Sequence, residues 1–183
     1  MFEILHFRKS ERILSNKNLL KDVQATMQYI DDVLTGALYT RELLRMALDE
    51  MDWTADIDSM RILENRRYMY KGVKRGVAID GNVNAYEYIL EGLVRLQIGY
   101  DKKQIEAGIL LVNAKRSDKS PLGTTADLIK SEIESLYPTI HLPVAVCLIS
   151  TGEPILYDKE GNPYGSVSVS KDDNPTTRKT PTG

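Results

Sequence analysis

The segment GVKRGVAIDGNVNAY, residues 72–86, contains a basic pair, an apolar run and an acid in close succession. The apolar residues 77–79 are typical of a buried strand, and Asp80 follows them directly, before a Gly-Asn turn. A charge at the end of a buried strand is costly unless it is paired, bound to a metal or left facing solvent. Asp80 is therefore the first candidate for a functional residue.

Apolar patterns before this segment predict two helices and a strand pair. One helical stripe consists of Leu19, Leu20, Val23, Met27, Ile30, Val33 and Leu34. A second helix is expected over 41–53, with Thr40 as its N-cap. The stretch 66–80 predicts two short strands joined by a turn at 71–72, with the second strand ending at Asp80.

The pattern after the segment continues the alternation of helices and strands. Asn84 is a candidate N-cap of the next helix, or part of the turn before it, and Gly99 is the expected end of that helix. Thr124 or Thr125 is expected to cap the helix after it. The predicted elements are a helix over 85–99, a strand over 106–114, a helix over 126–137 and a strand over 142–150.

The continuous apolar strands between these helices indicate a sheet that is buried on both faces. The expected fold class is therefore α/β (α+β), with a mixed β-sheet flanked by helices. A chain of 183 residues is long enough for one domain, which we place at residues 1–150. Residues 151–170 predict an appended β-hairpin that turns at 160–162, and residues 171–183, which contain no large apolar side chain, predict a disordered tail.

Composition excludes several classes of protein. Apolar residues make up 42% of the chain and no run is long enough to span a membrane, so we expect no membrane association. The N-terminus lacks the layout of a signal peptide, which predicts a cytoplasmic protein. The one cysteine, Cys147, predicts a small buried side chain rather than a reactive thiol. With His6 and His141 isolated from each other, neither a zinc site nor a histidine-dependent hydrolase is favoured.

Basic residues gather in two places although the net charge is −2. The run 65–79 contains no acid and includes Tyr68 and Tyr70, and a second basic spot lies within 113–124. Basic side chains interleaved with aromatic ones are typical of nucleic-acid binding, and equally of a solvated face on a strand pair. The basic residues are Arg66, Arg67, Lys71, Lys74 and Arg75 in the run, and Lys115, Arg116 and Lys119 in the spot.

Neither a P-loop nor a dinucleotide-binding glycine turn is present, which leaves the strand end at Asp80 as the arrangement with chemical content. In metal-dependent nucleases, carboxylates at the ends of adjacent strands hold a divalent ion that activates water and stabilises charge on phosphorus.

The chain resembles the BglII/BstYI group of type II restriction endonucleases, and more distantly BamHI, within the PD-(D/E)xK nuclease superfamily. The likeness covers about residues 2–150. It rests on the order and spacing of FEILHFRKSERILSN before a long helix, Met-Asp-Trp at 51–53, VKRGVAIDGNVNAY, AGILLV, TTADLIKSEIESL and PVAVCLIS. The resemblance implies a restriction-endonuclease-like core and a homodimer that binds double-stranded DNA.

The resemblance also implies where a metal site would lie. The group takes an Asp on one strand, a Glu nine residues later and a polar residue, usually Gln, two further on; these fall on Lys71, Asp80 and Asn82. Asp80 is then the one metal-ligand candidate at its usual place, while an ammonium cannot ligate a hard cation. A shifted alignment recruits Glu64 or Glu87 instead. Lys71 is expected either to pair with Asp80 in place of the metal or to point to solvent.

Three hypotheses about function follow. The preferred one is a DNA-binding protein on a restriction-endonuclease-like fold that has lost cleavage and needs no cofactor. The alternative is an active Mg²⁺-dependent endonuclease with an unusual ligand set, and the third is a protein-interaction module that does not bind DNA. By the resemblance, loop 113–124 contacts the bases. Its candidate residues are Lys115, Arg116, Lys119 and Ser120.

Overall fold

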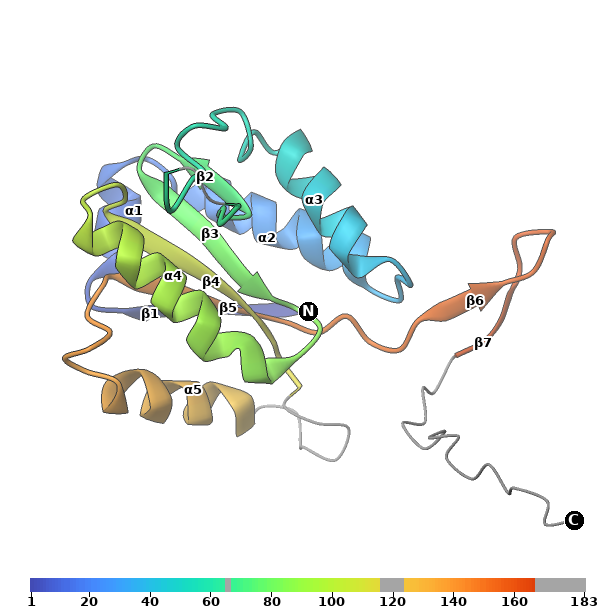
Figure 1. Ribbon diagram of the computed structural model, residues 1–183. Helices are drawn as coiled ribbons and strands as arrows, with labels where there is room; N and C mark the ends of the chain where they lie inside the picture. Colours follow the sequence, from blue (N-terminus) through green and yellow to red (C-terminus); the bar gives the residue numbers. More distant parts are fainter. Residues whose placement is uncertain (65–66, 116–123, 167–183) are drawn as a thin grey trace, which may run out of the picture.

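Five strands form the central sheet, in the order β1-β5-β4-β3-β2 (Figure 1). The computed structural model describes residues 1–64, 67–115 and 124–166. Strands β3, β4 and β5 run parallel, while β1 and β2 pair antiparallel at the two edges. The predicted α/β class with a mixed sheet is therefore confirmed. The strands are β1 (Phe2–Phe7), β2 (Gly72–Lys74), β3 (Val77–Asn82), β4 (Ala107–Asn113) and β5 (Val144–Ile149).

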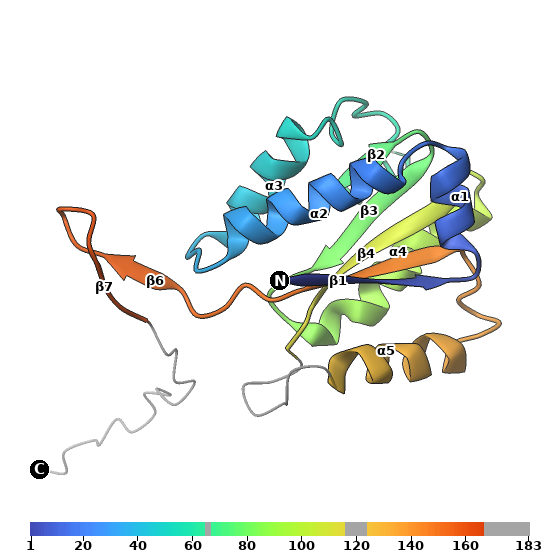
Figure 2. The same cartoon turned by 180° about the vertical axis from the view of Figure 1, so that it is seen from behind.

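Helices cover both faces of this sheet. The helices α1, α2 and α3 lie on one face, and α4 and α5 lie on the other, as the two opposite views show (Figures 1 and 2). The helices are α1 (Ser10–Asn16), α2 (Leu20–Leu34), α3 (Thr40–Glu50), α4 (Ile89–Asp101) and α5 (Thr124–Ser135), with a short 3₁₀ turn (Tyr86–Tyr88) before α4.

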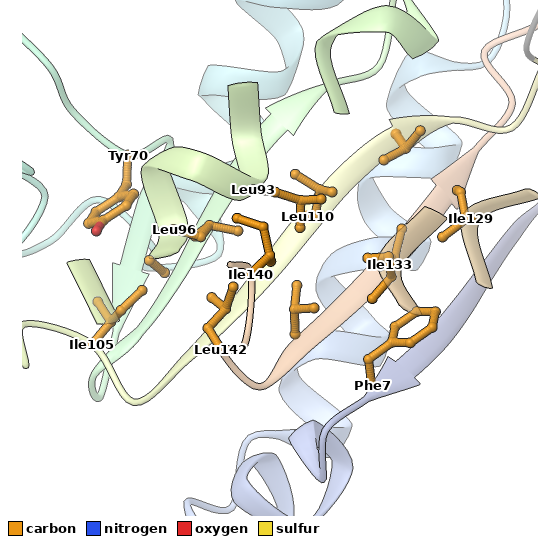
Figure 3. Close-up of a cluster of buried hydrophobic side chains, with 14 of the residues drawn as sticks. Phe7, Tyr70, Leu93, Leu96, Ile105, Leu110, Ile129, Ile133, Ile140 and Leu142 are labelled. Atoms are coloured by element: carbon orange, nitrogen blue, oxygen red, sulfur yellow. The ribbon is translucent and has the colours of Figure 1, made fainter. Parts of the chain in front are cut away.

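The side chains of the central strands point alternately to the two faces of the sheet, which divides the core into two layers. In β4, Leu110 packs under α4 and α5 (Figure 3), as does Val112, whereas Ile109 and Leu111 pack under the other three helices. Side chains point to opposite faces of a strand in turn, so a strand that is buried on both sides must be apolar throughout. Cys147 belongs to the second layer and is fully buried, as predicted.

The turn between β2 and β3 lies later than predicted. Lys74 pairs with Val77, so the turn is formed by Arg75 and Gly76 rather than by residues 71–72. Both turn residues have positive φ, 50° and 75°, which is the requirement of the two-residue hairpin turn whose twist matches antiparallel strands. Strand β3 also continues past Asp80 to Asn82.

Three further local features differ from what the sequence predicted. Helix α4 does not end at Gly99 but continues to Asp101; a Cβ at Gly99 would collide with the Tyr70 hydroxyl, so this glycine serves packing. Of the two predicted caps of α5, Thr125 does not serve, because its hydroxyl donates to the Ala114 carbonyl at 2.6 Å; the side chain of Thr124 lies outside what the structure describes. Strand β1 and helix α1, at the start of the chain, had no predicted counterpart.

The predicted C-terminal hairpin is present. Strands β6 (Ile155–Tyr157) and β7 (Pro163–Ser166) pair antiparallel and extend away from the main body (Figures 1 and 2). Backbone hydrogen bonds of Gly36 with Thr151 and Ile155, at 2.7 and 2.9 Å, tie the start of this arm to the turn after α2. The predicted tail, 171–183, lies outside the described residues. None of the helices in the described part is long and apolar enough to cross a membrane.

Candidate functional site at the end of strand β3

Two glycines set the distance between β3 and the helix that crosses it. A Cβ at Gly92 in α4 would lie 3.3 Å from the Cα of Gly81, so the helix and the strand approach closely here. Gly81 has a φ of 113°, and a Cβ there would collide with the backbone of Leu111 in β4. Only glycine, which has no Cβ, can adopt this backbone conformation and fit into this space. The close approach places Arg95, one turn after Gly92, above Asp80.

Asp80 is almost completely buried, with 1% of its surface exposed. Its Oδ1 accepts a hydrogen bond from the Gly81 amide at 2.8 Å, while its Oδ2 has no hydrogen-bond partner. The nearest cation is Arg95, whose Nη1 lies 3.7 Å from Oδ2. Burial raises the pKa of this carboxyl above its ordinary value, against the lowering effect of the Gly81 amide, Arg95 and Lys71.

Lys71 lies beside Asp80 without pairing with it. The Lys71 amide donates to the Ile79 carbonyl at 2.9 Å, which fixes the backbone next to β3. The predicted ion pair between Lys71 and Asp80 is wrong, because α4 brings Arg95 to that carboxylate instead. The Lys71 side chain is half-buried, and burial lowers the pKa of its ammonium, while the Asp80 charge opposes this shift.

A pocket of about 380 Å³ surrounds these side chains. Arg41, Lys71 and Arg95 contribute three positive charges to its lining, and Asp80 and Glu91 two negative ones. Glu91 is already paired with Arg95 along helix α4. The lining as a whole therefore carries one net positive charge.

A larger cleft of about 1160 Å³ shares one wall with this pocket. Arg41, Lys71, Asn84 and Arg95 line both. Thr40, at the start of α3, donates to the Asn84 side chain at 2.7 Å and so joins the two helical layers across the end of β3. Because the two side chains bind each other, neither makes the N-cap hydrogen bond that its position in the sequence predicts.

The described residues at this strand end supply few oxygen ligands for a divalent cation. Hard cations such as Mg²⁺ need several, and the two carboxylates that line the pocket, Asp80 and Glu91, both lie against Arg95. The Asn82 Oδ1 accepts from the Asn84 amide at 2.8 Å, and neither Glu64 nor Glu87 lines the pocket. Across the described residues, no cluster of three or more His, Cys, Asp or Glu side chains has the arrangement of a metal site.

The basic run predicted from the sequence is divided between two ends of the sheet. Lys74 and Arg75 lie at the β2–β3 turn, at the opposite end of β3 from Asn82. Lys74 donates to the Met51 carbonyl and pairs with Asp22 at 2.7 Å, and Arg75 donates to the Lys17 carbonyl. The structure does not bring these two residues to the pocket.

Residues 113–115 lead into the predicted base-contacting loop from the same edge of the sheet as the pocket. Asn82 lies opposite Val112 in the parallel pair of β3 and β4. The Asn113 side chain accepts from the Lys115 amide at 2.8 Å, which repeats the geometry of Asn82 with Asn84. Arg67 is exposed, whereas Arg66, Arg116, Lys119 and Ser120 lie outside the described residues.

Arg41 and Arg95 are the site residues that sequence reasoning missed. Arg41 is the second residue of α3 and Arg95 lies in the middle of α4, so neither belongs to the segment around Asp80. One signal was present in the sequence: Gly92 interrupts an otherwise helical pattern, and such a glycine indicates close backbone approach.

Comparison with solved structures defines the fold. No protein-family model matches the chain, and neither does any curated protein sequence. The structure is similar to that of the restriction endonuclease BglII in complex with a DNA 16-mer. The TM-score is 0.60 at 13% identity, over 97% of this chain and 95% of the other. Free BglII gives a TM-score of 0.53 at 15% identity, over 90% and 91%. The chain therefore has a restriction-endonuclease-like fold.

Proposed function

We propose that the protein binds double-stranded DNA and does not cleave it. The observation that carries this proposal is the composition of the pocket at Asp80: three cations line it with two carboxylates, and Arg95 is paired with both of these carboxylates. Metal-dependent phosphodiester hydrolysis needs an ion to activate water and to stabilise the developing charge. An ion bound to Asp80 would need further anionic ligands around it. Arg95 and Lys71 line that part of the pocket instead.

Support for DNA as the partner comes from the fold and from the charge of the site. The similar BglII structure is a complex with DNA, and the pocket of this chain carries net positive charge in a protein whose net charge is −2. Cations that line a concave site attract the phosphate backbone. The homodimer implied by the sequence resemblance stays part of this proposal, and sedimentation with and without duplex tests it.

The test combines binding with cleavage. Purified protein is expected to shift a random-sequence duplex at low salt and to leave plasmid DNA intact in Mg²⁺ or Mn²⁺. Metal-dependent double-strand breaks that disappear in Asp80→Ala would instead establish the active-endonuclease alternative. If no duplex is shifted even at low salt, DNA is not the partner, and the protein-interaction hypothesis replaces this one.

A further inference from the structure

The Lys71 side chain lines the pocket at Asp80. Among the described residues it forms neither a hydrogen bond nor an ion pair, although it is half-buried. A charged donor that is partly removed from water is costly unless an acceptor reaches it. Arg41 and Arg95 line the same pocket, so three cationic side chains converge on one space.

Asp80 does not satisfy this group of cations. Its Oδ2 is buried without a hydrogen-bond partner, and the 3.7 Å separation from Arg95 is longer than a hydrogen bond. The second acid, Glu91, is paired with Arg95 within helix α4. The pocket of about 380 Å³ thus holds more positive than negative charge and leaves room for an anion.

A backbone phosphate fits this arrangement. A phosphodiester carries one negative charge, which balances the one net positive charge of the lining, and its oxygens accept from lysine and arginine. The pocket shares a wall with the larger cleft, which is larger than an inorganic anion requires. Four cationic side chains line this cleft against two acidic ones, Glu42 and Asp49. A phosphate that is part of a long chain is the ligand for such a site.

We infer that Lys71, with Arg41 and Arg95, holds one phosphate of the DNA backbone directly in the pocket at Asp80, without a bridging metal ion. This inference rests on the DNA binding proposed above. Asp80 is then a buried counter-charge to Arg95 that the phosphate contact does not require, and not a metal ligand. The site would have changed from one that binds cations through carboxylates to one that binds a phosphate through cations.

Fluorescence anisotropy with a labelled duplex, titrated with salt, tests the inference. Lys71→Met removes no hydrogen bond or ion pair seen among the described residues of the free protein. It is expected to weaken DNA binding by about tenfold, because the hydrogen bond from the ammonium to the charged phosphate is lost. It should also flatten the log-log salt slope by about 0.9, the value for one phosphate contact. Lys71→Arg should retain both. Lys102→Met, at the far end of α4, is the matched control and should change neither.

Two further measurements separate a direct phosphate contact from a metal bridge. Chelation with EDTA is expected to leave the affinity unchanged, and Asp80→Asn is expected to bind at least as tightly as the parent, since it removes a negative charge from the phosphate site. Weaker binding in EDTA or in Asp80→Asn would overturn the inference. An unchanged affinity and salt slope in folded Lys71→Met, while the parent binds DNA, would also overturn it. Lys71→Gln provides a second variant, and its melting temperature shows whether it is folded. A parent that binds no DNA overturns the proposed function as well.

Discussion

Arg95 of α4 lies over Asp80 of β3, with its Nη1 3.7 Å from an Oδ2 that accepts no hydrogen bond. The two residues come from different layers of the fold, and the near-contact of Gly92 with Gly81 brings them together. This relationship has a measurable consequence for stability, because Asp80 is buried and Arg95 is its nearest compensating charge.

Replacing Arg95 with methionine should destabilise the protein. The variant leaves a buried carboxylate without its cation; since Arg95 itself is one-third exposed, we expect a loss of only about 1–2 kcal/mol of unfolding free energy. Urea denaturation measures this loss. The exposed Arg45→Met in α3 is the control and should change little. Asp80→Asn combined with Arg95→Met should recover most of the loss, and a purely additive double variant would contradict the interaction.

Asp80→Asn should stabilise the protein at neutral pH. Because burial raises the native pKa of Asp80, the native state binds this proton more tightly than the unfolded chain does. The parent therefore loses stability as pH rises from the ordinary carboxyl pKa through the raised native pKa. The advantage of the asparagine variant should be absent at pH 3 and grow as the pH rises towards 7. Denaturation across this pH range tests it, with exposed Glu3→Gln as the control.

Gly81→Ala should be costly. Its φ of 113° disfavours any side chain, and the added Cβ would collide with the Leu111 backbone. We expect a loss of at least about 2 kcal/mol, more than the strain of an unusual backbone conformation alone. Gly152→Ala is a matched control, since that glycine has a φ of 67° but open space around it, and should lose only about 1 kcal/mol. Equal losses in the two variants would mean that space at Gly81 is not limiting.

Lys74→Ala should affect folding and leave DNA binding unchanged. Lys74 pairs with Asp22, donates to the Met51 carbonyl and lies over the Trp53 ring, all away from the pocket. Removing it should cost about 1 kcal/mol of stability, with no change in the salt slope of binding. This expectation differs from the nucleic-acid-binding role that the basic run suggests for Lys74. A flatter slope in Lys74→Ala would restore that role.

A designed metal site provides the last test. The triple variant Lys71→Asp, Asp80→Glu, Asn82→Gln restores the ligand types that the sequence resemblance implies. Mn²⁺ at about 100 times its dissociation constant should then stabilise the variant by about 2.7 kcal/mol, because the ion binds the native state alone. The parent should show no metal-dependent shift of its melting temperature. A shift of equal size in the parent would show that Asp80 already binds metal.

The sequence by itself determined the layered architecture. Continuous apolar runs such as those of β4 and β5 require burial on both faces, and the helical stripe of α2 supplies one of the covering surfaces. Strand β1 was missed because its burial alternates irregularly, and the β2–β3 turn because a positive φ at Arg75 leaves little trace in residue type. Local patterns therefore predicted which segments are buried, and less exactly where they begin and end.

Only the tertiary structure decided which charges meet. Sequence position placed Lys71 beside Asp80, yet Arg95 is the residue that pairs with this carboxylate, and Lys74 pairs with Asp22 from a distant helix. Burial follows from the hydrophobicity of neighbouring residues along the chain, so the sequence pattern predicts it. A side-chain contact depends on how a helix crosses a strand; here, the space left by two missing Cβ atoms, at Gly81 and Gly92, sets the geometry of the site.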